Sequence, residues 1–442
     1  MLGLGAENYA MLKFLFGKVK GAQITVCDKR SKDVLGDKYK ELKNKVAWKF
    51  GESFNKELYK FDVLFRSPGW PTDCPGIKGA THPGGARPHP SPLLIKERGK
   101  TILYSPIRLF FDLCPTKNII GVTGTKGKGT TSSLIYEIIK QAGKRVWLGG
   151  NIGIAPFEFI KKIKENDWVV LELSSFQLED LDKSPRIAVI TNFYREHLAP
   201  ADPNNPNFHR SFSKYRNAKL NIIKWQQAGN LAILNRKLGA NVGRKVGKGQ
   251  HVYFTKSALP SRLPGEHNKE NIAAAETVAR LMNIKPASIA KAVANFRGLE
   301  HRLEIVREVK GVKYYNDSFA TTPESTIIAL KSFKPPIVLL AGGADKGANF
   351  KSLAKEIKKR VQFTVLFKGA ATPRIVNELK RTGYPKSRIK TVNNIVTAVS
   401  LARKKIGKTG TVLLSPACAS FGMFKNYKER GELFKHEVKK LT

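Results

Sequence analysis

The sequence predicts an α/β protein made of three successive domains. Two observations lead to this prediction. At 442 residues the chain is too long for one ordinary hydrophobic core. Short apolar strand patterns also alternate with helical patterns along the chain, which is typical of mostly parallel sheets with helices on both faces. We place the domains at residues 1–115, 116–300 and 301–442.

The first domain is predicted to be Rossmann-like. Gly3-Leu-Gly5 precedes an apolar helical pattern, and strand patterns follow at residues 23–27, 46–50 and 61–65. The order indicates a βαβ unit whose first strand is nearly missing. The last of these strands runs into Ser67-Pro-Gly69, a turn at the strand's carboxyl end. Ligands of open α/β sheets bind at such ends.

The central domain opens with Gly121-Val-Thr-Gly-Thr-Lys-Gly-Lys-Gly-Thr-Thr131, placed between an apolar strand and a helical pattern that runs to Gln141. Its glycines allow backbone N–H groups to turn toward an anion, and Lys128 adds a cation where the helix begins. This pattern predicts a P-loop that binds nucleotide phosphates. A tight turn without a ligand is the alternative, which the lysine and the hydroxyls disfavour.

Polar motifs follow the other predicted strands of the central domain, which lie at residues 145–148, 168–172, 187–191 and 231–234. Glu172 ends a buried apolar strand, where an unpaired carboxylate would be costly, so we expect a cation such as Mg²⁺ beside it. A surface-facing strand end is the alternative. The third domain, again Rossmann-like, has strand patterns at residues 336–340, 363–367 and 411–414 with similarly polar ends. We expect a ligand held between domains.

The composition limits the class of protein. The formal charge of +43 raises a nucleic-acid hypothesis. The lysines are scattered, however, and no base-reading or stacking motif is present, so we favour a solvated basic surface and no specific nucleic acid. No apolar run approaches the roughly twenty residues of a membrane span, and the start lacks a signal-peptide pattern. We expect a cytoplasmic protein with its four cysteines reduced.

In this order the motifs resemble those of the Mur ligases, most closely of the members that add D-glutamate. The resemblance covers nearly the whole chain and rests on Leu171-Glu-Leu-Ser-Ser-Phe-Gln-Leu-Glu179, Gly149-Gly-Asn-Ile-Gly153, Asn316-Asp-Ser318, and Leu413-Leu-Ser-Pro-Ala-Cys-Ala-Ser420 followed by Phe424-Lys-Asn-Tyr427. It implies an ATP-dependent ligase of peptidoglycan precursor synthesis. The carboxylate of UDP-N-acetylmuramoyl-L-alanine is phosphorylated, and the amine of D-glutamate attacks the acyl phosphate. It also implies a domain each for the UDP-sugar, ATP and the amino acid. We expect a monomer.

The resemblance also implies the site residues. Lys128, Glu172, His197 and Lys219 are expected to be catalytic, with Lys219 carbamylated. Mg²⁺ is expected at Thr130, Glu172, His197 and Lys219. The ATP-binding residues are expected to be Gly124, Thr125, Lys126, Gly127, Lys128, Gly129, Thr130, Thr131, Asn268, Asn271, Arg302 and Asp317. The residues expected to bind the UDP-sugar are Gly5, Lys29, Arg30, Gly69, Asn151, Ser174 and Gln177. Those expected to bind D-glutamate are Thr321, Lys346, Ser420 and Tyr427. Without the resemblance, Lys219 is a solvated helical lysine, and the asparagines are helix caps.

Three features depart from the family pattern. Gly129 stands where a hydroxyl residue usually helps to hold the metal, so Thr130 is expected to substitute. Phe319 replaces a lysine after Asn316-Asp-Ser318, and the segment 199–210 is longer than usual. The alternatives are a related Mur or folylpolyglutamate-type ligase with another amino acid, a ligase that binds nucleotide without turnover, or a basic P-loop nucleic-acid-binding protein.

Overall fold

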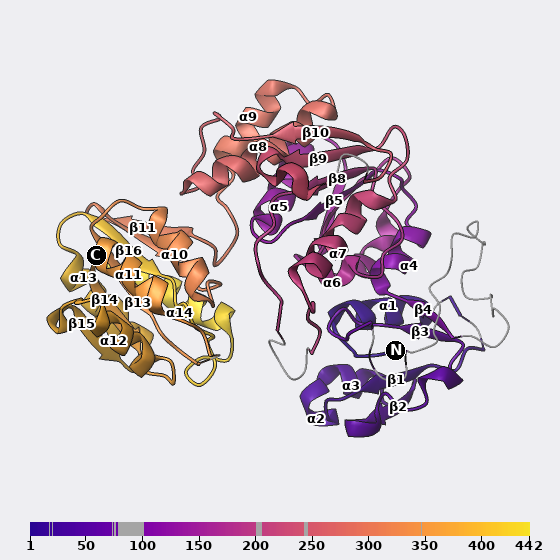
Figure 1. Ribbon diagram of the computed structural model, residues 1–442, viewed down its shortest axis with the longest axis horizontal. Coiled ribbons are helices and arrows are strands. Elements are labelled where there is room, and N and C mark those ends of the chain that lie inside the picture. The colour runs from indigo at the N-terminus through magenta and orange to yellow at the C-terminus, as the bar shows by residue number, and fades with distance from the viewer. Residues whose placement is uncertain are drawn as a thin grey trace. The chain divides into compact units, whose positions relative to one another are not determined.

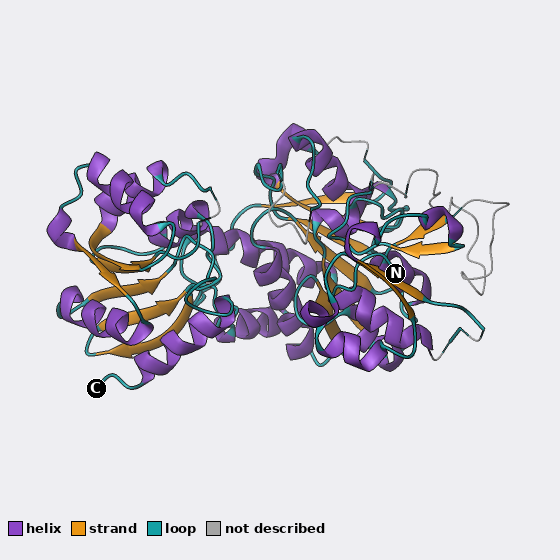
Figure 2. Cartoon of the chain, turned by 90° about the horizontal axis from the view of Figure 1, so that it is seen from below, coloured by secondary structure: helices purple, strands orange, loops and turns teal. Residues whose placement is uncertain are grey.

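The computed structural model describes residues 1–16, 18–19, 21–72, 74, 77, 101–199, 206–242, 246–345 and 347–442. The chain forms two compact units (Figure 1). The first comprises Met1–Leu259 with Glu270–Val293, and the second comprises Pro260–Lys269 with Ala294–Thr442. Each is described by itself below. Both are built of sheets with covering helices (Figure 2), so the predicted α/β class is confirmed.

The N-terminal part of the first unit contains two parallel strand pairs. Strand β1 (Thr25–Asp28) pairs with β2 (Ala47–Phe50), and β3 (Val63–Phe65) pairs with β4 (Ile102–Tyr104). Leu2 forms parallel bridges to Cys27 and to Arg66, so a single residue stands where the expected first strand would lie. The helices of this part are α1 (Ala6–Phe16), α2 (Lys32–Leu35), α3 (Asp37–Leu42) and α4 (Pro106–Leu113).

The central sheet of the first unit is parallel throughout its described strands and has the order β10-β9-β8-β5-β7-β6. These strands are β5 (Ile119–Thr123), β6 (Val146–Gly150), β7 (Trp168–Glu172), β8 (Ile187–Ile190), β9 (Leu231–Asn235) and β10 (Gln250–Phe254). After β5 the chain forms β6 and β7 on one side of β5, and it then forms β8, β9 and β10 on the other side. The carboxyl end of β5 is therefore the topological switch point, where such sheets bind ligands.

The helices associated with this sheet are α5 (Lys128–Gln141), α6 (Ser175–Leu178), α7 (Phe212–Lys224), α8 (Glu266–Leu281) and α9 (Pro286–Asn295). One apolar core joins the central sheet to the N-terminal part. Within it the ring of Phe14 on α1 lies 5.1 Å from that of Phe157, and Phe110 on α4 lies 6.1 Å from Phe159. This shared core explains why the N-terminal strand pairs and the central sheet belong to one compact unit.

The sheet of the second unit has the order β11-β12-β16-β13-β14-β15, in which β11 is antiparallel to β12 and the other described pairs are parallel. The strands are β11 (Glu304–Val309), β12 (Val312–Asn316), β13 (Ile337–Ala341), β14 (Val361–Phe367), β15 (Ile389–Val392) and β16 (Gly410–Leu414). Helices α10 (Pro323–Lys331), α11 (Lys351–Arg360), α12 (Thr372–Arg381), α13 (Ile395–Ile406) and α14 (Tyr427–Lys439) cover it, and a separate apolar core lies on each face.

Every strand named from the sequence overlaps an observed strand, whereas β4, β10, β11, β12 and β15 were not predicted. Within the described ranges, no helix combines the length and the apolar character needed to cross a membrane.

Candidate functional site

The phosphate loop connects β5 to α5 at the switch point of the central sheet. Gly124 and Gly127 have φ angles of 145° and 84°, which L side chains rarely adopt. Helix α5 begins at Lys128, so its first N–H groups have no partner within the helix and are available to an anion. Asn192, after β8, holds the loop: its Oδ1 accepts from the Lys126 N–H at 2.8 Å and its Nδ2 donates to the Lys126 carbonyl at 2.9 Å.

The side chains of the loop are held by groups that follow β8 and by helix α7. The hydroxyls of Thr125 and Tyr215 lie 2.8 Å apart. Lys126 forms an ion pair with Glu196 at 2.6 Å, and Lys128 Nζ donates to the Thr125 carbonyl at 3.0 Å. Gly129 is buried, whereas Thr130 is half-buried and makes no side-chain hydrogen bond to any described residue.

Glu172 lies at the carboxyl end of β7 and is 3% exposed, so the alternative of a surface-facing strand end is wrong. Its Oε1 accepts from Asn151 Nδ2 at 3.0 Å, and its carbonyl accepts from the Asn151 N–H at 2.8 Å. A residue expected at the UDP-sugar and a residue expected at the metal are thus in direct contact.

Lys219 on α7 is 2% exposed, so the alternative of a solvated lysine is also wrong. Its Nζ lies 3.4 Å from Thr123 Oγ1 and 4.9 Å from the centre of the Tyr215 ring. No carboxylate of the described chain forms an ion pair with it. Burial, and then the charge of Lys128, hold the pKa of Lys219 well below its usual range, against the opposing effect of Glu196 and Glu172.

His197 follows β8 in the left-handed region, with φ of 58°. The residue is exposed, and its ring lies 5.0 Å from the ring of Phe176 and 6.2 Å from that of Tyr215. The site residues expected at the metal therefore come from the ends of β7 and β8, from α5 and from α7.

The other residues expected at the UDP-sugar lie in the N-terminal part and on α6. Gly5 directly precedes α1, and Lys29 and Arg30 follow β1. Asp28 accepts from Arg30 at 2.9 and 2.7 Å and from the Leu4 N–H at 2.6 Å, which fixes the arginine beside the start of α1. Lys29 pairs with exposed Glu52 at 3.3 Å. The carbonyl of Gly69 accepts from Asn207.

Ser174 and Gln177 form a capping box at the start of α6. Ser174 Oγ accepts from the Gln177 N–H at 3.2 Å, and Gln177 Oε1 accepts from the Ser174 N–H at 2.8 Å. Gln177 Nε2 also donates to Glu7 on α1. The spacing Ser-x-x-Gln is the sequence signal that identifies this cap.

In the second unit, Asp317 is 7% exposed and accepts from Ser415 Oγ at 2.7 Å and from the Leu303 N–H at 3.2 Å. Burial raises its pKa to about 7, although these hydrogen bonds oppose the rise. The guanidinium of Arg302 lies 3.7 Å from the centre of the Phe319 ring, and the Phe319 and Tyr427 rings are 5.0 Å apart. Phe319, the departure from the family pattern, is thus a stacking surface for Arg302.

The remaining expected residues are placed as follows. Ser420 is buried and Thr321 is half-buried, whereas Lys346 lies outside the described residues. Asn268 and Asn271 are both buried on α8. Asn268 Nδ2 donates to the Pro264 carbonyl at 2.7 Å, and Asn271 Oδ1 accepts from Thr131 of the phosphate loop at 3.4 Å.

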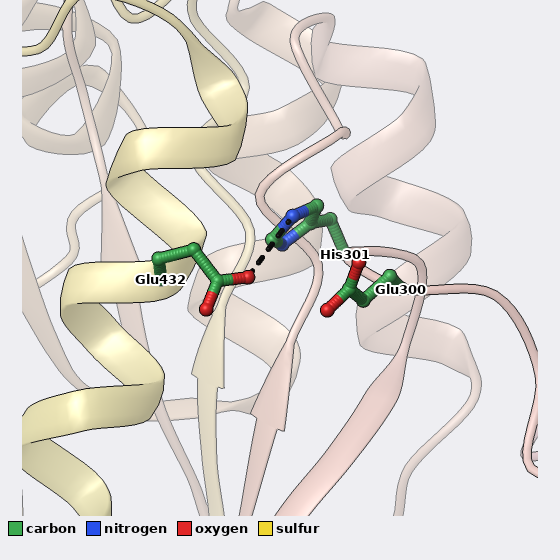
Figure 3. Close-up of side chains that lie close together, drawn as sticks. All are labelled: Glu300, His301 and Glu432. Carbon is green, nitrogen blue, oxygen red and sulfur yellow. Dashed lines mark ion pairs between the residues drawn. The ribbon is translucent and has the colours of Figure 1, made fainter.

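An acidic cluster that sequence reasoning missed also lies in the second unit. Glu300, His301 and Glu432 face one another, with 3.6 Å between His301 Nε2 and Glu432 (Figure 3). Lys435 pairs with both carboxylates of the cluster, since its Nζ is 2.5 Å from Glu300 and 2.8 Å from Glu432. Burial alone would lower the pKa of Lys435, but these two hydrogen bonds raise it. The cluster therefore fastens α14 to the segment that carries Arg302.

A glycine-rich loop at the switch point of a parallel sheet, with buried Glu172 and Lys219 beside it, defines a P-loop nucleotide-binding protein. Three family models agree with this class: the MurD-like N-terminal domain of Mur ligases matches residues 1–86, the Mur ligase middle domain matches 122–257, and the Mur ligase glutamate ligase domain matches 301–418. The chain belongs to the Mur ligase family, and the predicted three-domain organisation is confirmed.

Curated relatives match over the full chain. The UDP-N-acetylmuramoylalanine--D-glutamate ligase of Acetivibrio thermocellus is 36% identical over 99% of this chain and 95% of its own length. That of Symbiobacterium thermophilum is 35% identical over 100% and 98%.

Solved structures share the fold at low identity. The UDP-N-acetylmuramate-alanine ligase MurC of Thermotoga maritima has a TM-score of 0.58 at 18% identity, covering 99% of this chain and 98% of its own. The MurF ligase of Thermotoga maritima, in complex with ADP, has a TM-score of 0.56 at 16% identity, covering 95% and 96%.

Proposed function

We propose that this chain joins D-glutamate to UDP-N-acetylmuramoyl-L-alanine in an ATP-dependent reaction of peptidoglycan precursor synthesis. The observation that carries the proposal is the full-length similarity to ligases of that name, at 35–36% identity. The phosphate loop and the buried Glu172 and Lys219 beside it supply the matching chemistry. The alternative of a nucleic-acid-binding protein is not favoured, since neither the family nor the site supports it.

The reaction needs charge neutralisation more than covalent help from the protein. An oxygen of the substrate carboxylate attacks the γ-phosphorus of ATP, and ADP leaves. The amine of D-glutamate then attacks the acyl carbon, and the tetrahedral intermediate loses phosphate and a proton to give the amide. Lys128 and the N-terminus of α5 hold the phosphates in line for the first step.

The residues present fit a divalent cation. Glu172 provides a buried carboxylate, and His197 provides an imidazole. Lys219 fits as an anionic ligand once it is carbamylated, because its depressed pKa favours the neutral amine that reacts with CO₂. Thr130 offers a hydroxyl that no described residue engages. Mg²⁺ bound there supplies positive charge to the phosphate and carboxylate oxygens.

The expected substrate contacts are part of the proposal. The UDP-sugar binds to residues of the central sheet and α6, namely Asn151, Ser174 and Gln177. It also binds to Gly5, Arg30 and Gly69 of the N-terminal part. ATP is bound by Arg302 and Asp317. D-glutamate is bound by Thr321, Lys346, Ser420 and Tyr427. The domain boundaries near residues 115 and 300, the monomeric state and the cytoplasmic location stay predictions.

Removing the amine of Lys128 tests the role of the loop. We expect Lys128→Ala to lower ATP-driven amide formation by at least about 100-fold, the scale of losing one charged transition-state contact. The measurement is phosphate release with both substrates and Mg²⁺, and Lys140→Ala at the other end of α5 is the matched control. A near-normal rate in Lys128→Ala would remove the loop from the mechanism.

A further inference from the structure

His209 lies beside the proposed cation site but belongs to none of the expected site residues. It is held by its backbone, since its N–H donates to the His197 carbonyl at 2.8 Å. Its ring stacks on Phe176 with 4.9 Å between centres and 9° between planes, and it meets the edge of Tyr215 at 5.4 Å. Phe176 and Tyr215 are the two rings that also contact His197.

One nitrogen of His209 has no hydrogen-bond partner in the described structure. The residue is 2% exposed, and Nε2 is fully shielded and unpartnered. Buried polar atoms are rarely left this way, because the lost hydration costs about 1–3 kcal/mol. The free-energy cost of burying Nε2 without a partner would be offset by a ligand that engages this nitrogen.

The opposite edge of the ring faces a carboxylate. Nδ1 lies 3.9 Å from Glu179 Oε1, too far for a direct hydrogen bond but near enough for its charge to favour the proton on Nδ1. Glu179 is partly exposed at the end of α6, so Nε2, on the other edge of the ring, is directed away from it. This tautomer leaves an electron pair on Nε2. A carboxylate behind a histidine is the usual second-shell arrangement of histidines at metal sites.

The site already contains the cationic side chains of Lys126 and Lys128 together with Lys219. A histidine that offers the electron pair of Nε2 adds no further positive charge to it.

We propose that His209 is a further positioning residue of the divalent-cation site, whose Nε2 electron pair engages the cation or a water bound to it, with Glu179 fixing the tautomer. The inference rests on the proposed function for the presence of the cation. Sequence reasoning missed this residue because it falls in the long segment between His197 and Lys219, where no motif marks it.

His209→Phe tests the proposal, because phenylalanine keeps the stacking on Phe176 and removes both nitrogens. We expect the affinity for Mn²⁺, measured by electron paramagnetic resonance in the presence of a non-hydrolysable ATP analogue, to fall about 10-fold. The melting temperature without metal should be unchanged or higher, since a buried unpartnered nitrogen is lost. A merely structural histidine would give the reverse pattern. His251→Phe on β10 is the matched control and should leave Mn²⁺ binding unchanged.

A second variant keeps the test decisive if His209→Phe fails to fold. Glu179→Gln should weaken Mn²⁺ binding about twofold to fivefold, as expected for an indirect contact. Loss of one ¹⁴N coupling to Mn²⁺ in His209→Phe, with the coupling of His197 retained, would assign direct ligation, and weaker binding without that loss would assign a bridging water. Unchanged Mn²⁺ affinity in the folded variants overturns the proposal. Wild-type protein that binds Mn²⁺ through His209 but shows no D-glutamate-dependent turnover would overturn the proposed function alone.

Discussion

Lys219 shows how burial changes the chemistry of one side chain. A lysine at the surface of α7 would stay protonated, but this one is 2% exposed and lies near the cation of Lys128. Both effects favour the neutral amine, which can attack CO₂ to form a carbamate and release a proton. The sequence placed this residue only through the family resemblance, because helical periodicity by itself could not reveal how deeply the lysine is buried.

We expect Lys219→Ala to lose most ligase activity, and added bicarbonate not to restore it. Bicarbonate should raise the wild-type rate wherever carbamylation is incomplete. The rate of amide formation across a bicarbonate titration measures both effects. Lys214→Ala, an exposed lysine on the same helix, should behave like wild type. An unchanged rate in Lys219→Ala would refute the carbamate role.

Asp317 makes the stability of the second unit depend on pH. Its pKa is raised from 3.8 to about 7, so the stability it contributes is fully present below pH 4 and is lost as the pH rises through 7. Wild-type protein should therefore lose up to about 1.4 kcal/mol per pH unit in this window relative to Asp317→Asn. Calorimetric melting of both proteins from pH 4 to 7.5 measures the difference. A difference that does not change with pH contradicts the raised pKa.

Glu7, in the first unit, provides an internal comparison. Burial also raises its pKa to about 7, so Glu7→Gln should change the pH dependence of the first unit's transition and leave that of the second alone.

Among the elements, strands made of buried apolar residues were predictable, whereas the edge strands β10, β11 and β15 were not. The residues of β5, β8 and β13 are all buried and form continuous apolar runs. In contrast, β11 and β10 are edge strands that contain half-buried or exposed polar residues such as Glu304, Arg307 and Gln250. Their partner strands, rather than their own apolar content, stabilise them, and a single sequence does not show which partner is present.

Helix α6 is too short to be stable alone, so its position depends on its capping box and on Arg66. Arg66 follows β3 and is fully buried; it donates to Asp180 at 3.0 and 2.7 Å and to the Phe176 carbonyl at 3.3 Å. It thereby ties the N-terminal sheet to the helix that carries Gln177 and precedes Glu179. Sequence patterns predicted β3 but neither α6 nor this contact, because the two residues are 114 positions apart.

Arg66→Met should destabilise the first unit by about 3–5 kcal/mol, because it leaves Asp180 buried without its cation. The double variant Arg66→Met with Asp180→Leu should recover most of this loss. Calorimetry should show the change in the transition of the first unit. Arg381→Met removes an exposed pair with Glu378 in the second unit and should cost less than about 1 kcal/mol. If Arg66→Met lowers the free energy of unfolding no more than Arg381→Met does, the contact between Arg66 and Asp180 is not important for the stability of the first unit.

For the whole molecule, the family assignment accounts for the order of the motifs, while the charge of +43 is a property of its surface. Nearly every substrate is anionic, and a basic surface attracts such molecules at low ionic strength. The effect weakens with salt because the Debye length is only about 8 Å at physiological ionic strength.

Phosphate release from ATP by the purified wild-type chain tests the central claim most directly. UDP-N-acetylmuramoyl-L-alanine and Mg²⁺ are supplied throughout, while D-glutamate, L-glutamate and other amino acids are offered in turn. We predict release with D-glutamate, in equal amounts with the amide product, and little release with the others or without the UDP-sugar. Phosphate release that is independent of D-glutamate, or that is supported better by another amino acid, would contradict the account.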